Sequence, residues 1–187
     1  MSDSNITKQA LANSLKEMMT KKNFSKISVN DIVENCGLTR PSFYYHFEDK
    51  YDLMNWIYYT ETARLMINYD SIEHCTDGIR DLCYYMIKNK IFYTNALNTT
   101  GQNSFPEYLE SYIRTISGTV IENTLGTDID RKKWEMTVEL ASTALVGIII
   151  KWANNGMKDD PVDFITLGKS IVDGSLFSEL QKREKNK

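Results

Sequence analysis

Apolar residues recur at helical spacing along almost the whole chain, and this periodicity restricts the fold more than any other feature. In residues 5–22, Leu11, Leu15, Met18 and Met19 form one such stripe. No segment alternates polar and apolar residues for long enough to nominate a strand, and three prolines in 187 residues leave room for long helices. The sequence therefore predicts an all-α protein of about nine helices.

Capping residues mark the ends of the predicted helices. Beyond residues 5–22, helices are predicted over residues 28–36, 39–47, 49–68, 77–90, 91–97, 104–125, 130–155 and 160–182. Ser104, Pro106 and Glu107 combine a cap, an early proline and a carboxylate, as Asp160, Pro161 and Asp163 also do. The last residues, KREKNK, are expected to be a frayed tail.

The charge balance argues against a protein that coats nucleic acid indiscriminately. The formal net charge is −3, and the first 50 residues hold seven of the 22 basic and six of the 25 acidic residues. The remainder is therefore the acidic part of the chain. Any DNA contact is expected to be localised in the N-terminal third.

The cysteines and the apolar segments indicate a cytoplasmic protein without a membrane partner. Cys36, Cys75 and Cys83 lack CxxC spacing, and the first residues lack the apolar core of a signal peptide. The longest apolar run, residues 140–150, is shorter than the roughly 20 residues that cross a bilayer, so it predicts a buried helix or an interface. A metal site at His74, Cys75 and Cys83 would lack a completing ligand pair, so buried thiols are favoured and no metal or cofactor is expected.

Residues 28–47 have the outline of a helix-turn-helix, with two short helices on either side of Gly37. In the second helix, Phe43 and Phe47 are four residues apart and can pack inward with Leu38. This leaves four side chains for the solvent: Arg40, Ser42, Tyr45 and His46. The alternative is a small helical bundle in which the aromatic residues serve only as core.

The exposed set has the chemistry of a DNA contact. Arg40 can pair with a guanine edge or a phosphate, and hydroxyl groups such as that of Ser42 can reach phosphates or bases. Lys50 lies at the start of the predicted fourth helix, where free backbone N–H groups and the helix dipole favour a phosphate.

The segment ISVNDIVENCGLTRPSFYYHFEDKYDL resembles the signature of the tetracycline-repressor family, and the resemblance covers roughly residues 6–55. It implies that Ser28 contacts a phosphate and that Lys50 holds the DNA backbone. It also implies that six residues face the operator: Thr39, Arg40, Ser42, Tyr44, Tyr45 and His46. His46 departs from the tyrosine that is commoner in the family. Ser28 can equally be only a helix cap, and Tyr44 can equally support the core.

The resemblance also implies a division of the chain, with a helix-turn-helix domain in residues 1–48 and a helical effector or partner-binding and dimerisation domain in residues 49–187. Helices eight and nine would pair with their copies in a homodimer. Their apolar faces agree with this, although either could belong to the core of a monomer: Met136, Leu140, Ala144, Gly147, Ile148 and Trp152, and Phe164, Leu167, Ile171 and Phe177.

The function that the resemblance implies is sequence-specific regulation of transcription at double-stranded operator DNA, controlled by a small-molecule effector or a co-regulator protein. The segments DKYDLMNWIYYTE and GQNSFPEYL resemble the branch that includes regulators of dihydroxyacetone kinase operons, which implies that activation through a protein partner alone is the alternative. An aromatic set could line an effector cavity or be core: Tyr58, Tyr59, Tyr84, Tyr85, Met86 and Tyr93. An enzyme is not expected, because the chain has no glycine-rich phosphate loop, no paired metal-ligand motif and only two histidines.

Overall fold

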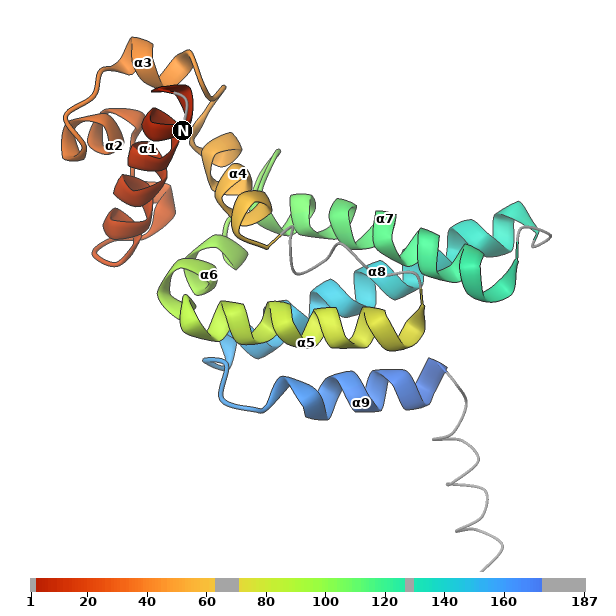
Figure 1. Cartoon of the computed structure of the whole chain (residues 1–187). Coiled ribbons are helices and arrows are strands. Elements are labelled where there is room, and N and C mark those ends of the chain that lie inside the picture. Colours follow the sequence, from red (N-terminus) through yellow and green to blue (C-terminus); the bar gives the residue numbers. More distant parts are fainter. Residues whose placement is uncertain (1–2, 63–70, 127–129, 173–187) are drawn as a thin grey trace, which may run out of the picture.

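The computed structural model has a small helical head joined by one helix to a larger helical body (Figure 1). It describes residues 3–62, 71–126 and 130–172, which contain nine α-helices, one 3-10 helix and no strand. The head consists of α1 (Asp3–Met19), η1 (Phe24–Lys26), α2 (Val29–Asn35) and α3 (Arg40–Tyr44), and α4 (Lys50–Thr62) leads out of it. The body consists of α5 (Ile72–Lys88), α6 (Lys90–Leu97), α7 (Phe105–Leu125), α8 (Arg131–Asn154) and α9 (Pro161–Val172). The all-α prediction is confirmed.

Local capping bonds explain where most of these helices begin. Asp49 Oδ1 accepts hydrogen bonds from the backbone N–H groups of Tyr51 and Asp52, both at 2.8 Å, and Asp130 caps α8 in the same way. The prediction was wrong for α5, which begins five residues early because the Ser71 hydroxyl accepts a bond from the N–H of His74. The predicted continuations over residues 63–68 and 173–182, with Ala63, Ile67 and Phe177, lie outside the described residues, as does the KREKNK tail.

One buried apolar cluster runs from the head through α4 into the body. Leu15 and Phe43 are fully buried in the head, and Leu53 and Ile57 of α4 carry the same cluster toward the body. Burial of apolar surface contributes roughly 25 cal/mol per Å² to the free energy of folding. Packing therefore holds α4 against both the head and the body. Helix α4 thus shares one core with the head and with the body.

Helix α8 has one face against the body and one face open to solvent. Its inner face packs against α7, and an ion pair between Arg114 and Glu139 joins the two helices. On the open face, Met136 and Leu140 are 64% and 72% exposed. Trp152 was wrongly assigned to this face, because it is 4% exposed, contacts Phe164 of α9 and donates its indole N–H to the Asp159 carbonyl oxygen at 2.9 Å.

The 24 residues of α8 are long and apolar enough to cross a bilayer by length and composition. Only about a third of the most apolar part of α8 is buried within the chain. One helix of this kind is weak evidence for a membrane span, because core helices of water-soluble proteins have the same length and composition. The uncovered apolar surface is instead a candidate contact for another polypeptide.

The predicted aromatic set separates into core and surface. Tyr58, Met86 and Tyr93 are fully buried, whereas Tyr59 and Tyr84 are exposed. The ring of Tyr58 makes edge-to-face contacts with four other rings, those of Tyr93, Phe105, Tyr108 and Tyr112. The core interpretation is thus confirmed for the buried members.

The hydroxyl group of Tyr93 gives the first testable prediction. This oxygen is buried and has no hydrogen-bond partner among the described residues, and burial raises the pKa of the phenol well above its usual value. We expect Tyr93→Phe to change the free energy of unfolding by less than about 1 kcal/mol, and Tyr93→Ala to lower it by about 3–5 kcal/mol through the cavity it leaves. Urea denaturation checks both values, and a larger loss in Tyr93→Phe would mean that the hydroxyl has a partner in solution.

Candidate nucleic-acid interface

The helix-turn-helix begins at Ser28, whose hydroxyl is fully engaged as a cap. Ser28 Oγ accepts a bond from the Asp31 N–H at 3.1 Å, and Asp31 Oδ2 accepts from both the Ser28 N–H and the Ser28 hydroxyl at 2.7 Å. These bonds, with Lys22 at 3.1 Å, lower the pKa of Asp31 to about 2. The cap assignment is confirmed, and a phosphate contact by Ser28 stays a prediction.

Helix α3 ends at Tyr44, three residues before its predicted end, and is positioned by a cap at its start and by two buried rings, one within the helix and one just after it. Thr39 Oγ1 accepts the Ser42 N–H at 3.4 Å, and Gly37 takes the positive φ of +71° that the preceding turn requires. Phe43 and Phe47 are buried, with their ring centroids 5.9 Å apart. The predicted inward face of this helix is confirmed.

The opposite side of α3 presents a polar and aromatic surface with no carboxylate. Residues 35–47 contain neither Asp nor Glu. Tyr45 is 82% exposed and its ring meets that of His46 edge to face at 4.8 Å. Arg40 lies over the ring of Tyr44 and donates to its hydroxyl at 3.3 Å, and Tyr44 is 50% exposed. Tyr44 therefore both contacts Phe43 and reaches solvent.

The structure brings Thr39, Arg40, Ser42, Tyr44, Tyr45 and His46 together on this short segment, but it gives Lys50 different surroundings. Lys50 Nζ donates to three backbone carbonyl oxygens of the turn between α1 and α2: Phe24 at 2.9 Å, Ser25 at 3.4 Å and Ile27 at 2.7 Å. Partial burial lowers the pKa of this ammonium group. An ammonium has three donors, so a phosphate contact by Lys50 would replace one of these bonds. The predicted role of Lys50 on DNA stays a prediction, whereas its role inside the head is a finding.

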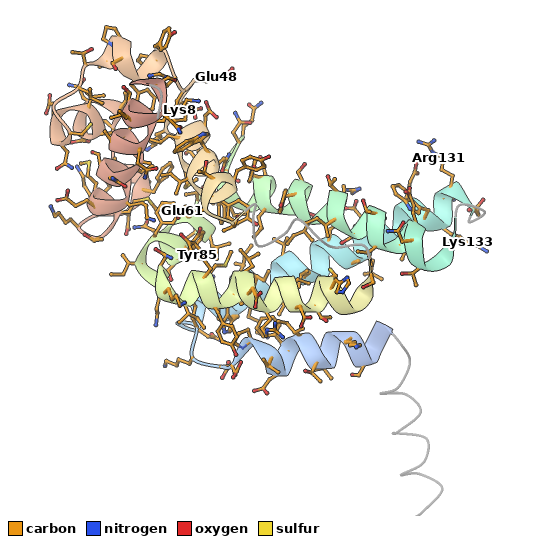
Figure 2. The ribbon with its side chains drawn as sticks, in the orientation of Figure 1. Lys8, Glu48, Glu61, Tyr85, Arg131 and Lys133 are labelled. Carbon is orange, nitrogen blue, oxygen red and sulfur yellow. The ribbon has the colours of Figure 1, made fainter. Side chains whose placement is uncertain are left out.

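Two groups of side chains that link the head to the body were missed at the sequence level. Glu61 of α4 accepts from Lys16 of α1 at 2.6 Å and from the Tyr85 hydroxyl of α5 at 2.7 Å. Figure 2 labels Glu61 and Tyr85 where the head, α4 and α5 meet. Helix α6 of the body also contacts the head, through Asn95.

The Asn95 carboxamide makes three hydrogen bonds to the backbone of the α1–η1 turn. Asn95 Oδ1 accepts the Phe24 N–H at 3.0 Å, and Asn95 Nδ2 donates to the carbonyl oxygens of Met19 and Lys22 at 3.1 and 3.3 Å. These partners are more than 70 residues away in sequence, so no local pattern announces them. They fix the base of the head, below α1 in Figure 1, against α6.

The buried-thiol prediction is confirmed for Cys83, whereas Cys75 and Cys36 are only partly buried. Burial raises the pKa of Cys75 to about 11 and that of Cys83 to about 12, and Cys83 is fully buried. Within the residues that the structure describes, no three His, Cys, Asp or Glu side chains are arranged to hold a metal ion.

Comparison with known families matches both parts of the chain. Residues 13–56 match the tetR family of bacterial regulatory proteins, and residues 73–174 match a family described as the C-terminal region of transcriptional regulators. The first match covers the head from the middle of α1 onward, and the second covers the body from the start of α5 to the end of α9.

Individual relatives agree with these families. The chain is 29% identical over 93 residues to a helix-turn-helix transcriptional activator of the dhaKLM operon, DhaS, from Lactococcus lactis subsp. lactis strain IL1403, and the match spans 50% of each chain. A solved structure of a dihydroxyacetone kinase operon activator DhaS shares the fold with a TM-score of 0.62, 21% identity and coverage of 92% and 96% of the two chains. The fatty acid degradation regulator FadR from Bacillus halodurans gives a TM-score of 0.59 at 12% identity, with coverage of 84% and 93%.

The contacts of Lys50 generate the second prediction. We expect Lys50→Ala to lower the free energy of unfolding by about 1–3 kcal/mol, because it leaves carbonyl groups of the turn without their donor. Thermal denaturation, compared with Lys26→Ala, measures this, since Lys26 is an exposed lysine of the same turn. Equal stability of the two variants would contradict a structural role for Lys50.

Proposed function

Because this chain belongs to the tetR family of bacterial transcriptional regulators, we propose that it binds its operator through α3 as a homodimer and responds to a signal received by its body. Proteins of this family are DNA-binding regulators rather than enzymes, as the sequence predicts. We retain the division into a DNA-binding domain of residues 1–48 and a regulatory and dimerisation domain of residues 49–187. A bacterial transcriptional regulator binds chromosomal DNA, so we expect this protein in the cytoplasm.

The observation that carries the proposal is the exposed, carboxylate-free surface of α3. Arg40 supplies a planar cation, and the hydroxyls of Thr39 and Ser42 stand at the N-terminal end of the helix, which enters the major groove first in helix-turn-helix proteins. Exposed aromatic rings such as that of Tyr45 can contact thymine methyl groups or the sugar-phosphate backbone. His46 belongs to this surface, Ser28 is retained as a predicted phosphate contact, and Lys50 contacts phosphate only by exchanging a carbonyl partner.

The open face of α8 supports the dimer. Leu140 and Met136 are largely exposed, and Ala144, Gly147 and Ile148 continue the same face toward the C-terminal end of the helix. Small residues beside large apolar ones let two helices approach closely. We propose that this face and the exposed Leu167 of α9 meet their copies in a second chain, which sets the distance between two heads.

The body provides the path for a signal. Glu61 ties α4 to α1 and α5, and Asn95 ties α6 to the base of the head. A small molecule or a co-regulator protein that favours one arrangement of these helices changes the orientation of α3. The dhaKLM operon transcriptional activator among the relatives favours activation as one mode for this chain.

Arg40 gives the prediction that tests DNA recognition. We expect native protein to bind a fluorescent duplex of its own upstream region more tightly than scrambled DNA, in a salt-sensitive manner, and Arg40→Ala to lose roughly 1–3 kcal/mol of that discrimination. Fluorescence anisotropy at two salt concentrations measures both. Arg131→Ala is the matched control, because Arg131 is exposed at the end of the body far from the head (Figure 2). If Arg40→Ala discriminates as well as native protein, α3 is not the recognition helix.

Leu140 tests the dimer. We expect Leu140→Glu to convert a dimer into monomers in sedimentation velocity, because it places a carboxylate in the centre of the proposed apolar contact. Ile91→Glu is the control, since Ile91 is similarly exposed but lies on α6. A Leu140→Glu protein that sediments as a dimer would exclude this face.

A further inference from the structure

A pocket of about 680 Å³ lies where the base of the head meets α6. One wall is the end of α1 and the turn that follows it, residues 19–25, and the other wall is α6 with residues 98–100. Pockets of roughly 300–1,000 Å³ accommodate small molecules. This pocket is therefore large enough for an organic ligand. Its two walls come from the head and from the body, the two parts whose relative position would have to change in regulation.

The pocket is basic although the chain is acidic. Its lining includes Lys21, Lys22 and Lys90 but no Asp or Glu, in a chain whose formal net charge is −3. A second pocket, lined by residues of α4 and α7, has the opposite character, with Glu48, Asp49, Asp52 and Glu107 in its lining. The charges at the junction are thus separated by sign, and the basic pocket attracts anions.

Two donors of the basic pocket have no partner among the described residues: Lys90 and the Thr94 hydroxyl. Lys21 pairs with Glu17 and Lys22 with Asp31, both outside the lining, whereas Lys90 is exposed and has no ion-pair partner in the described ranges. The Thr94 hydroxyl also lacks a hydrogen-bond partner among the described residues. An ammonium and a hydroxyl are the donors that phosphate and carboxylate groups accept from.

We propose that this pocket binds a small organic anion, a phosphate or carboxylate compound, and that Lys90 provides its principal charge. The anion bridges α6 and the α1–η1 turn beside the three Asn95 hydrogen bonds. It binds most tightly to the arrangement of head and body in which both walls are in place, so it shifts the protein toward that arrangement. The effect on DNA binding rests on the proposed function, whereas the binding of the anion does not.

Isothermal titration calorimetry with the full chain tests the binding step. Inorganic pyrophosphate and citrate, at matched ionic strength, are titrated into native protein, Lys90→Gln and Lys133→Gln. Lys133 is exposed at the far end of α8 (Figure 2), so its substitution removes the same charge away from the pocket. We expect one anion per chain, a roughly tenfold weaker affinity in Lys90→Gln and an unchanged affinity in Lys133→Gln. Preference for pyrophosphate or citrate distinguishes the two anion classes.

Equal affinities in all three proteins, or no binding of either anion, would overturn the proposal. Thermal denaturation without anion checks that Lys90→Gln folds normally, as expected for an exposed side chain. Anisotropy with the upstream duplex, with and without the anion, then tests the coupling, and we expect the operator affinity of native protein to change while that of Lys90→Gln does not. Failure of native protein to bind any DNA would count against the proposed function, and the calorimetry would still decide the pocket.

Discussion

The turn between α1 and α2 is the point on which the arrangement of the whole chain depends. Lys50 holds its carbonyl groups from within the head, and Asn95 holds its backbone from the body. Phe24, in the same turn, is buried against the ring of Tyr51 at 5.0 Å. Backbone polar groups at this depth need partners, so the two side chains stabilise a loop that would otherwise lose hydrogen bonds on burial. The position of α3 relative to the body follows from this joint.

The head and the body are thus connected in two different ways. Along α4 the connection is a continuous apolar core, which resists deformation because interiors are closely packed. At α6 and around Glu61 it consists of a few hydrogen bonds and one ion pair between half-buried side chains. Hydrogen bonds and ion pairs between half-buried side chains exchange readily with water or with a ligand. We therefore expect a ligand to shift the orientation of the head relative to the body most easily at these polar contacts.

In the homodimer that we propose, α8 sets the distance between the two recognition helices. Its buried face, with Val138, Val146 and Ile149, belongs to the body, and its open face is apolar and is left exposed by the described residues of the chain. The proposed dimer contact and the head joint are formed by different residues of the body: Met136 and Leu140 on α8, and Asn95 on α6.

The sequence alone determined what depends on neighbours within one or two helical turns. The helices, most of their caps, the buried rings Phe43 and Phe47 and the outward position of Arg40 and Tyr45 all follow from such local patterns. Tertiary structure decided the rest: the carbonyl partners of Lys50 lie 23 to 26 residues away, the backbone N–H and carbonyl partners of Asn95 lie 71 to 76 residues away, and Trp152 lies in the core instead of on the expected open face. Periodicity tells which residues share a face of a helix, but the angle at which that helix packs on its neighbours decides which part of the face is covered.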